Sequence, residues 1–198
     1  MTVSTAYAIP GRGTFFTAPK NTPLPTGGIA AFTLLGTAPA DWDNFGHTSE
    51  ENTPELSVDG GDATALGSWL QANLYTIYET TTWSLTGNSI QLDKVTLKKI
   101  YNGWDTADGK GVVVPAAKRG QELALVMLAS HDSGKFGLYI PNVNFTYGDA
   151  PAVDRETFME VPFSATFQAA DESVIPLSPD GEPGLFEIYG PEAFVSGS

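Results

Sequence analysis

The clearest pattern in the chain is an alternation of apolar and polar residues between Thr157 and Gln168. A period of two predicts a β-strand with one buried face. Because proline cannot donate to a sheet ladder, Pro162 predicts a sheet edge or a bulge. A strand this long needs a cover at its edge, either from another element or from another subunit. The apolar positions are Met159, Val161, Phe163, Ala165 and Phe167, and the polar ones are Glu160, Pro162, Ser164, Thr166 and Gln168.

Three other segments also predict strands. Residues 122–130 form a continuous apolar run, as expected for a strand covered on both faces. Residues 136–147 contain a strand that is broken at Pro141. Residues 69–80 alternate again. In that last segment one side carries Leu70, Ala72, Leu74 and Tyr78, and the other carries Gln71, Asn73 and Glu79.

One helix is predicted over about residues 89–101. Asn88 can act as its N-cap, with Gln91 three residues later in the capping-box position. Lys98 and Lys99 suit the negative C-terminal end, and Asn102-Gly103 predicts the stop. The partial apolar stripe consists of Ile90, Leu97, Ile100 and Tyr101.

The composition agrees with a β-structure that packs against this single helix. The 198 residues suffice for one core, and 21 glycines with 14 prolines favour many turns and short strands. The chain divides into an extended arm at 1–38, an acidic loop or hairpin at 39–62, a β core at 63–170 and a C-terminal tail at 171–198. Phe186 and Tyr189 predict a last short strand within the tail.

Charge is unevenly distributed along the chain, whose net charge is −13. Arg12 and Lys20 are the only charged residues among the first forty, whereas every charged residue in 40–62 is acidic. Such a block is usually a solvated loop. We also hypothesise that it meets the basic arm of a neighbouring copy. The acidic balance disfavours sequence-specific nucleic-acid binding and is compatible with solubility alone.

Catalytic and metal-binding patterns are scarce. The chain has no cysteine, and neither His47 nor His131 has a partner at metal-ligand spacing. His131-Asp132-Ser133 predicts a polar turn, since adjacent residues cannot converge as a catalytic triad. Asp59-Gly60-Gly61-Asp62 predicts a turn between strands more strongly than a calcium loop. We therefore expect no cofactor, no metal and no enzymatic activity.

No leader peptide and no membrane span are expected. Residues 1–10 lack a basic segment followed by an apolar one, and no stretch approaches the roughly 20 apolar residues that a span requires. Synthesis in a cytosol, without export, is the corresponding expectation.

A series of short segments gives the chain a resemblance to a known family. In order they are Trp42-Asp43-Asn44-Phe45-Gly46-His47-Thr48-Ser49-Glu50-Glu51-Asn52, Pro54-Glu55-Leu56, Asp59-Gly60-Gly61-Asp62, Leu66-Gly67-Ser68-Trp69, Ile100-Tyr101-Asn102-Gly103 and Leu138-Tyr139-Ile140-Pro141. Together they resemble the major tail tube proteins of long-tailed, siphovirus-type bacteriophages, particularly those of actinobacterial hosts. The resemblance spans residues 42–167.

The resemblance implies a β-sandwich or half-barrel with one flanking helix, in a single tail tube domain. It implies hexameric rings that stack helically into a tube, with arms and a long loop reaching the next ring. The implied location is the virion tail, with the tape measure, terminator and distal tail proteins as neighbours. Double-stranded DNA would pass non-specifically through a bore lined by acidic or small polar residues, since cationic walls would bind it.

The expected sites follow from this hypothesis. Expected bore or polar-face positions are Gln71, Asn73, Glu160, Ser164 and Thr166. Expected subunit or ring contacts are Arg12, Phe15, Phe16, Lys20, Trp42, His47, Thr48, Glu50, Glu51, Pro162, Phe186 and Tyr189.

Three alternatives stay open. A β-sandwich module could bind glycans or a receptor through exposed aromatic residues. A tail terminator or connector would share the fold family. A glycosidase would need Glu50 or Glu51 to converge with Glu156 or Glu160 in one cleft.

Overall fold

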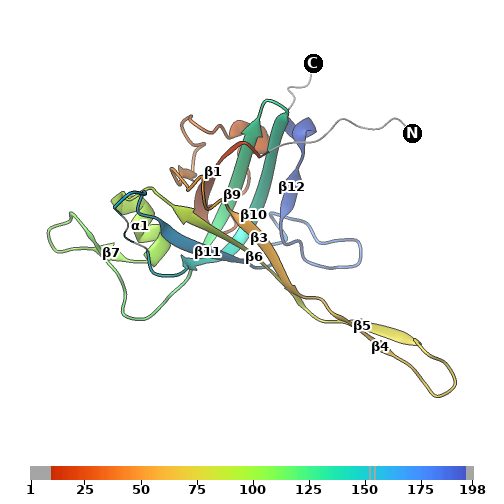
Figure 1. The fold of residues 1–198 in the computed structure, drawn as a ribbon. Coiled ribbons are helices and arrows are strands. Elements are labelled where there is room, and N and C mark those ends of the chain that lie inside the picture. The colour runs from red at the N-terminus through yellow and green to blue at the C-terminus, as the bar shows by residue number, and fades with distance from the viewer. Residues whose placement is uncertain (1–9, 152, 154, 195–198) are drawn as a thin grey trace.

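The computed structural model describes residues 10–151, 153 and 155–194, which form mainly β-strands and one α-helix (Figure 1). This confirms the predicted fold class. In chain order the elements are β1 (Arg12–Pro19), η1 (Gly28–Ala31), β2 (Asp43–Asn44), β3 (Glu55–Gly60), β4 (Ala63–Leu66), β5 (Tyr75–Tyr78), β6 (Thr81–Ser89), α1 (Lys94–Tyr101), β7 (Trp104–Asp105), β8 (Val112–Val113), β9 (Gln121–His131), β10 (Gly134–Tyr147), β11 (Val161–Phe167), β12 (Glu187–Tyr189) and η2 (Pro191–Phe194).

One antiparallel sheet organises the molecule. Its strands lie in the order β2-β1-β9-β10-β11-β6-β3, and β12 pairs with the first part of β10. The register along β10 shifts between Ile140 and Val143, which places a bulge at the predicted break at Pro141. Beyond the bulge the partner of β10 changes from β12 to β11. Strands β6 and β11 accordingly run at a steep angle to β9 and β10 (Figure 1).

The first face of the sheet carries the larger core. Phe145 and Phe163 stack with ring centroids 5.3 Å apart, and Phe45 packs edge-on against both. Helix α1 covers this cluster with the buried Ile100. Aromatic pairs of this geometry add to the free energy gained from apolar burial.

The second face is covered over only part of the sheet. There the segment between β1 and β2 folds back, so that Phe32 packs edge-on against Trp42 at 5.2 Å and tilted against Phe16 at 4.9 Å. Tyr139 completes the cluster and donates a 2.7 Å hydrogen bond to the carbonyl of Thr22. Residues of β9 alternate between the two cores, which confirms the prediction of a strand buried on both faces.

The helix is shorter than predicted and has a different cap. It begins at Lys94, and the Asp93 carboxylate accepts hydrogen bonds from the backbone amides of Val95 and Thr96 at 2.9 and 3.1 Å. Asn88, the expected cap, lies instead in β6. The predicted stop is confirmed, because Asn102 takes the left-handed conformation with φ 48°.

The prediction of an extended arm over 1–38 is wrong for much of the described part, and residues 1–9 of that arm lie outside it. Residues 12–19 form β1, which pairs with β9 along its whole length. Phe15 and Phe16 are 1% and 0% exposed and belong to opposite cores. Because glycine and proline are abundant nearby, the sequence prediction missed this strand.

Residues 55–89 form one long hairpin in place of the expected turn and separate strand. Strand β3 pairs with β6, and β4 pairs with β5 further out. Asp59-Gly60-Gly61-Asp62 therefore does not reverse the chain but bends one leg of the hairpin, with φ of 80° at Gly60 and 82° at Gly61. Gln71 and Asn73 lie in the loop at the tip, not in a strand. The outer part of the hairpin, with β4 and β5, projects far from the sheet (Figure 1).

Pro162 lies inside the sheet and not at its edge. Strand β11 pairs with β10 on one side and β6 on the other. The Pro162 carbonyl accepts from the amide of Gly148, which follows the last residue of β10. Because the N and C=O groups of one residue face the same antiparallel neighbour, the proline nitrogen points past the end of β10. Pro162 therefore lacks a donor only where the pairing with β10 ends.

Candidate assembly surfaces

The uncovered part of the second face is a broad polar surface across five strands. Residues paired directly across antiparallel strands share a face. One row of partners runs from β9 to β3 and a second from β10 to β3. The first row is Glu122, Asn144, Thr166, Ser84 and Ser57, and the second is Thr146, Ser164, Thr86 and Glu55. We call these two rows the polar face.

The polar face contains hydroxyl, amide and carboxylate groups and no lysine or arginine. Ser57 and Ser84 share a 2.8 Å hydrogen bond across β3 and β6. A shallow hollow at one end of the surface is lined by Glu55, Asn88, Asp149 and Pro162, among others. Lys20 reaches the rim, where it forms an ion pair with Glu122. The surface is thus polar and neutral to acidic.

Glu160 fastens the loop before β3 to this surface. Its carboxylate accepts hydrogen bonds from the side chains of Ser49, Asn52 and Asn88, the last two at 2.7 Å. Burial raises the pKa of Glu160, but these three donors outweigh it and hold the pKa below its ordinary value. The carboxylate thereby joins three segments at the base of the hairpin.

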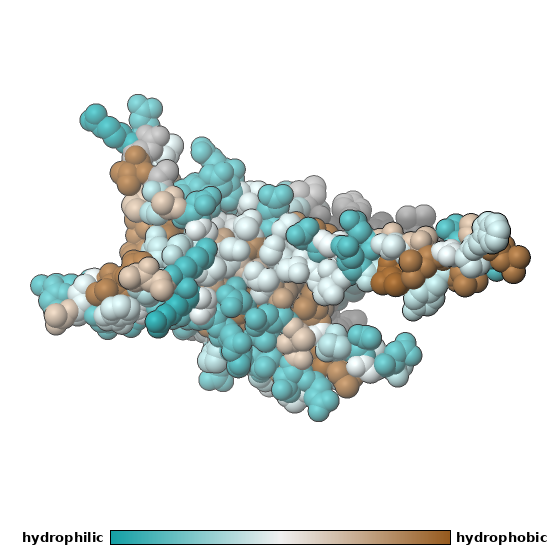
Figure 2. Space-filling model, turned by 90° about the horizontal axis from the view of Figure 1, so that it is seen from below, coloured by the Kyte–Doolittle hydropathy of each residue, from teal (hydrophilic) through white to brown (hydrophobic). Residues whose placement is uncertain are grey.

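The hairpin carries a large apolar surface outward. Trp69 and Leu70 at its tip are fully exposed, and apolar residues follow both legs (Figure 2). The other exposed apolar residues are Leu56, Val58, Leu66, Leu74, Tyr75, Ile77 and Tyr78. Contiguous apolar surface of this kind marks a site of protein interaction.

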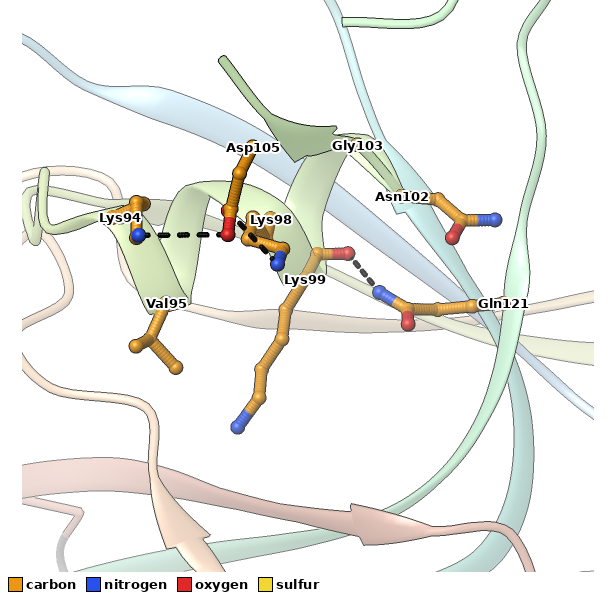
Figure 3. A pocket seen from close by; sticks show the side chains of 8 residues that line it. All are labelled: Lys94, Val95, Lys98, Lys99, Asn102, Gly103, Asp105 and Gln121. Carbon is orange, nitrogen blue, oxygen red and sulfur yellow. Dashed lines mark hydrogen bonds and ion pairs between the residues drawn. The ribbon is translucent and has the colours of Figure 1, made fainter. Parts of the chain in front are cut away.

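A third surface lies on α1 and the short β7–β8 hairpin. An open hollow there is lined by lysines on successive turns of α1, and Figure 3 shows Lys94 and Lys98 reaching toward Asp105. Their ammonium nitrogens lie 3.6 and 3.0 Å from its carboxylate oxygens. Hydrogen bonding to Lys98 and the charges of both lysines lower the pKa of Asp105.

The residues expected to contact other subunits lie in different parts of the structure. Phe15, Phe16 and Trp42 are buried in this chain and cannot meet a neighbour, which corrects the prediction for all three. Phe186 packs against Trp83 and Phe167 at centroid distances of 5.2 and 5.4 Å.

The other expected contacts lie nearer the surface. Lys20 is engaged by Glu122 within the chain. The exposed residues are Arg12, His47, Glu50 and Glu51, and the half-buried ones are Thr48, Pro162 and Tyr189.

The expected polar-face positions divide into two groups. Ser164 and Thr166 lie in the polar face, and Glu160 lies on the same side of the chain just before β11. Gln71 and Asn73 lie at the hairpin tip, away from it. The sequence prediction also missed Trp69 and Leu70. The uncharged run from Ala63 to Tyr78, together with Gly67-Ser68, is the signal that could have identified a projecting tip.

Chemistry is sparse among the described residues. No cluster of three potential metal-binding side chains occurs within them. His131 ends β9 and Ser133 lies in the tight turn to β10, where the Ser133 amide donates a 3.2 Å hydrogen bond to the imidazole Nδ1 of His131. No helix in the described part of the chain is long and apolar enough to span a membrane.

Comparison with known proteins adds one match. The model of the family described as phage tail tube protein matches residues 2–177, which includes the hairpin and every strand of the polar face. A search of curated proteins found no match.

Proposed function

This chain belongs to the phage tail tube protein family and is therefore a structural component of the phage tail, and we propose that it forms stacked hexameric rings that conduct double-stranded DNA. The observation that carries the proposal is the polar face. A ring of copies with this face turned inward encloses a bore lined by hydroxyl, amide and carboxylate groups.

The chemistry of the polar face suits passage of DNA. Phosphates along the duplex attract lysine and arginine strongly, and a wall of such residues would hold the DNA in place. Ser164, Thr166, Ser84 and Thr86 instead present hydroxyls that keep their water. Glu55 and Glu160 add negative charge that repels phosphate. Sliding without adhesion is the expected result.

Free sheet edges support closure of a ring. Among the described residues strand β3 pairs with β6 alone, and its Leu56 and Val58 are exposed. At the other end β2 covers only Phe16 and Thr17 of β1. Unpaired edges of this kind pair readily with other chains. Joining β3 of one copy to the open edge of the next would continue one sheet around the ring.

The long hairpin supplies a contact between copies. Its exposed apolar tip extends beyond the sheet, where a neighbouring subunit in the same or the next ring can bury it. We propose that the remaining partners are the tape measure, terminator and distal tail proteins of a siphovirus-type phage of an actinobacterial host. Assembly takes place in the host cytoplasm.

Electron microscopy of the purified protein tests this proposal. Negatively stained tubes with six-fold rings are expected. In purified virions the copy number of this protein should exceed that of any protein that forms a single ring per tail. A terminator or connector would instead occur as one ring per tail. Single particles that bind glycans would contradict the proposal and favour a binding module.

A further inference from the structure

Acidic and basic residues occupy separate segments of the chain, which the net charge alone does not reveal. Every charged residue from Asp41 to Asp93 is acidic. The next segment, 94–119, contains six of the ten basic residues of the chain. Those six are Lys94, Lys98, Lys99, Lys110, Lys118 and Arg119.

The fold carries the hairpin of the acidic segment and the basic segment to opposite sides of the molecule (Figure 1). At one end, Asp59, Asp62 and Glu79 surround the bend of the long hairpin, and we call them the acidic waist. At the other end lie α1, the β7–β8 hairpin and the loop that leads to β9, which we call the basic end (residues 94–119).

Among the described residues the acidic waist is not neutralised, and the basic end is neutralised only in part. No ion pair among the described residues involves a side chain of the acidic waist. At the basic end Asp105 pairs with both Lys94 and Lys98, and Lys99 pairs with Asp43 of β2. Lys110 and Arg119 are exposed and form no ion pair with a described residue.

Apolar surface accompanies the charge at both ends. Beyond the acidic waist lie the exposed Trp69 and Leu70. On the basic end Val95, Trp104 and Val114 are each about half exposed. The two surfaces are therefore opposite in charge and similar in apolar content, as partner surfaces of one interface are.

We propose that the acidic waist of one copy docks against the basic end of the next copy. The inference rests on the proposed self-assembly and assigns the pair of surfaces that meet. Because the two surfaces differ and lie at opposite ends, the contact is heterologous and repeats from copy to copy. Our earlier hypothesis placed Arg12 and Lys20 opposite the acidic segment, but Lys20 is already paired with Glu122.

The charges select the orientation of the contact, and the apolar tip provides most of its affinity. Exposed ion pairs are individually weak and are screened by salt. Complementary clusters nevertheless raise association rates and disfavour wrong pairings, such as two acidic waists facing each other. Assembly should accordingly weaken as ionic strength rises.

A charge-exchange experiment tests the pairing. The waist-reversed variant carries Asp59→Lys, Asp62→Lys and Glu79→Lys. The end-reversed variant carries Lys110→Glu, Lys118→Glu and Arg119→Glu, which leaves the ion pairs of Asp105 intact. Each alone should raise the critical concentration for assembly at least about tenfold. An equimolar mixture should restore tubes, because each altered surface finds an oppositely charged partner on the other variant.

Controls separate the possible outcomes. Asp180→Lys with Glu182→Lys changes charge in an exposed loop elsewhere and should assemble normally. Circular dichroism and thermal melting verify folding. If a reversed variant fails to fold, Asp62→Asn with Glu79→Gln should still weaken the salt dependence of assembly. Unimpaired assembly of both variants, or a mixture that stays unassembled, would overturn the pairing alone. Wild-type protein that never assembles would contradict the proposed function itself.

Discussion

A β-carbon placed on Gly60 would lie 2.3 Å from the carbonyl oxygen of Thr80 on the opposite leg of the hairpin. Gly60 also has a φ of 80°, in the left-handed region that side chains disfavour. The two constraints together fix the bend through which the hairpin projects. The direction of the hairpin therefore depends on the absence of a side chain at Gly60.

Substitution Gly60→Ala should impair assembly more than stability. The added methyl group must push Thr80 aside, which changes the direction of the tip, while the core lies elsewhere. We expect tubes to be lost or shortened in sedimentation and electron microscopy, with a loss of unfolding free energy near 1 kcal/mol from backbone strain.

The matched control is Gly181→Ala. Gly181 has a similar φ of 83° but no atom within 4 Å of a β-carbon. The Gly181→Ala variant should lose a similar unfolding free energy through backbone strain, but it should assemble normally. Equal behaviour of the two variants would argue against a role for the bend.

Removal of the apolar tip should abolish contacts between copies without unfolding the chain. Trp69→Ser with Leu70→Ser changes side chains that bury nothing in the single copy, so the unfolding free energy should change by less than about 0.5 kcal/mol. Assembly should fail in sedimentation velocity. Leu35→Ser, at a residue 91% exposed away from the hairpin, is the control and should assemble.

The sequence predicts part of this architecture well. Leu125 and Val126 stand in a continuous apolar run, and Phe163 and Ala165 in a strict alternation, so both strands were identifiable without tertiary information. Strand β1 was not, because Phe15 and Phe16 sit among glycines and prolines and point to opposite cores. Their burial depends on β9, more than a hundred residues away.

The assembly surfaces were only partly predictable for a related reason. Ser164 and Thr166 could be assigned to a polar face from alternation alone. Their alignment with Thr86 and Ser84 depends on the register of β6, which local patterns do not determine. Likewise, the regular alternation around Gln71 and Asn73 is typical of a strand, although the chain turns there.

Truncation in β1 should reveal that this segment is core. Phe15→Ala removes a ring that packs edge-on against Phe163 at 5.5 Å and against Phe45 at 6.4 Å. The expected loss of unfolding free energy is about 3–5 kcal/mol, measured by urea denaturation. Arg12→Ala in the same strand is exposed and should cost little. A small effect of Phe15→Ala would contradict the packing described above.

Acidification should loosen the base of the hairpin through Glu160. The folded-state pKa lies below its ordinary value of 4.5, so the folded state binds fewer protons. The stabilisation is therefore complete above about pH 4.5 and is lost as the pH falls through the folded-state pKa.

The variant Glu160→Gln tests this dependence. It should cost about 1 kcal/mol at neutral pH, allowing for solvent screening of a carboxylate that is only partly covered. The difference from wild type should shrink in acid. A difference that stays constant between pH 7 and pH 3 would exclude the charged form as the cause. Denaturant titrations across that range provide the measurement.

Cations on the polar face should retain DNA. Ser164→Lys with Thr166→Lys places ammonium groups in both rows of the polar face while leaving the hairpin and the sheet edges unchanged. Tubes should form, but each ring would carry added positive charge, and filter binding should detect duplex DNA on the tubes at low salt. Ser164→Asn with Thr166→Asn is the neutral control and should retain none.

The orientation of the polar face in the assembled protein is the central claim, and electron cryomicroscopy of the tube measures it directly. The account predicts a six-fold ring in which Ser164, Thr166, Ser84 and Thr86 face the bore. A reconstruction in which these residues lie on the outer wall, or are buried between rings, would contradict it.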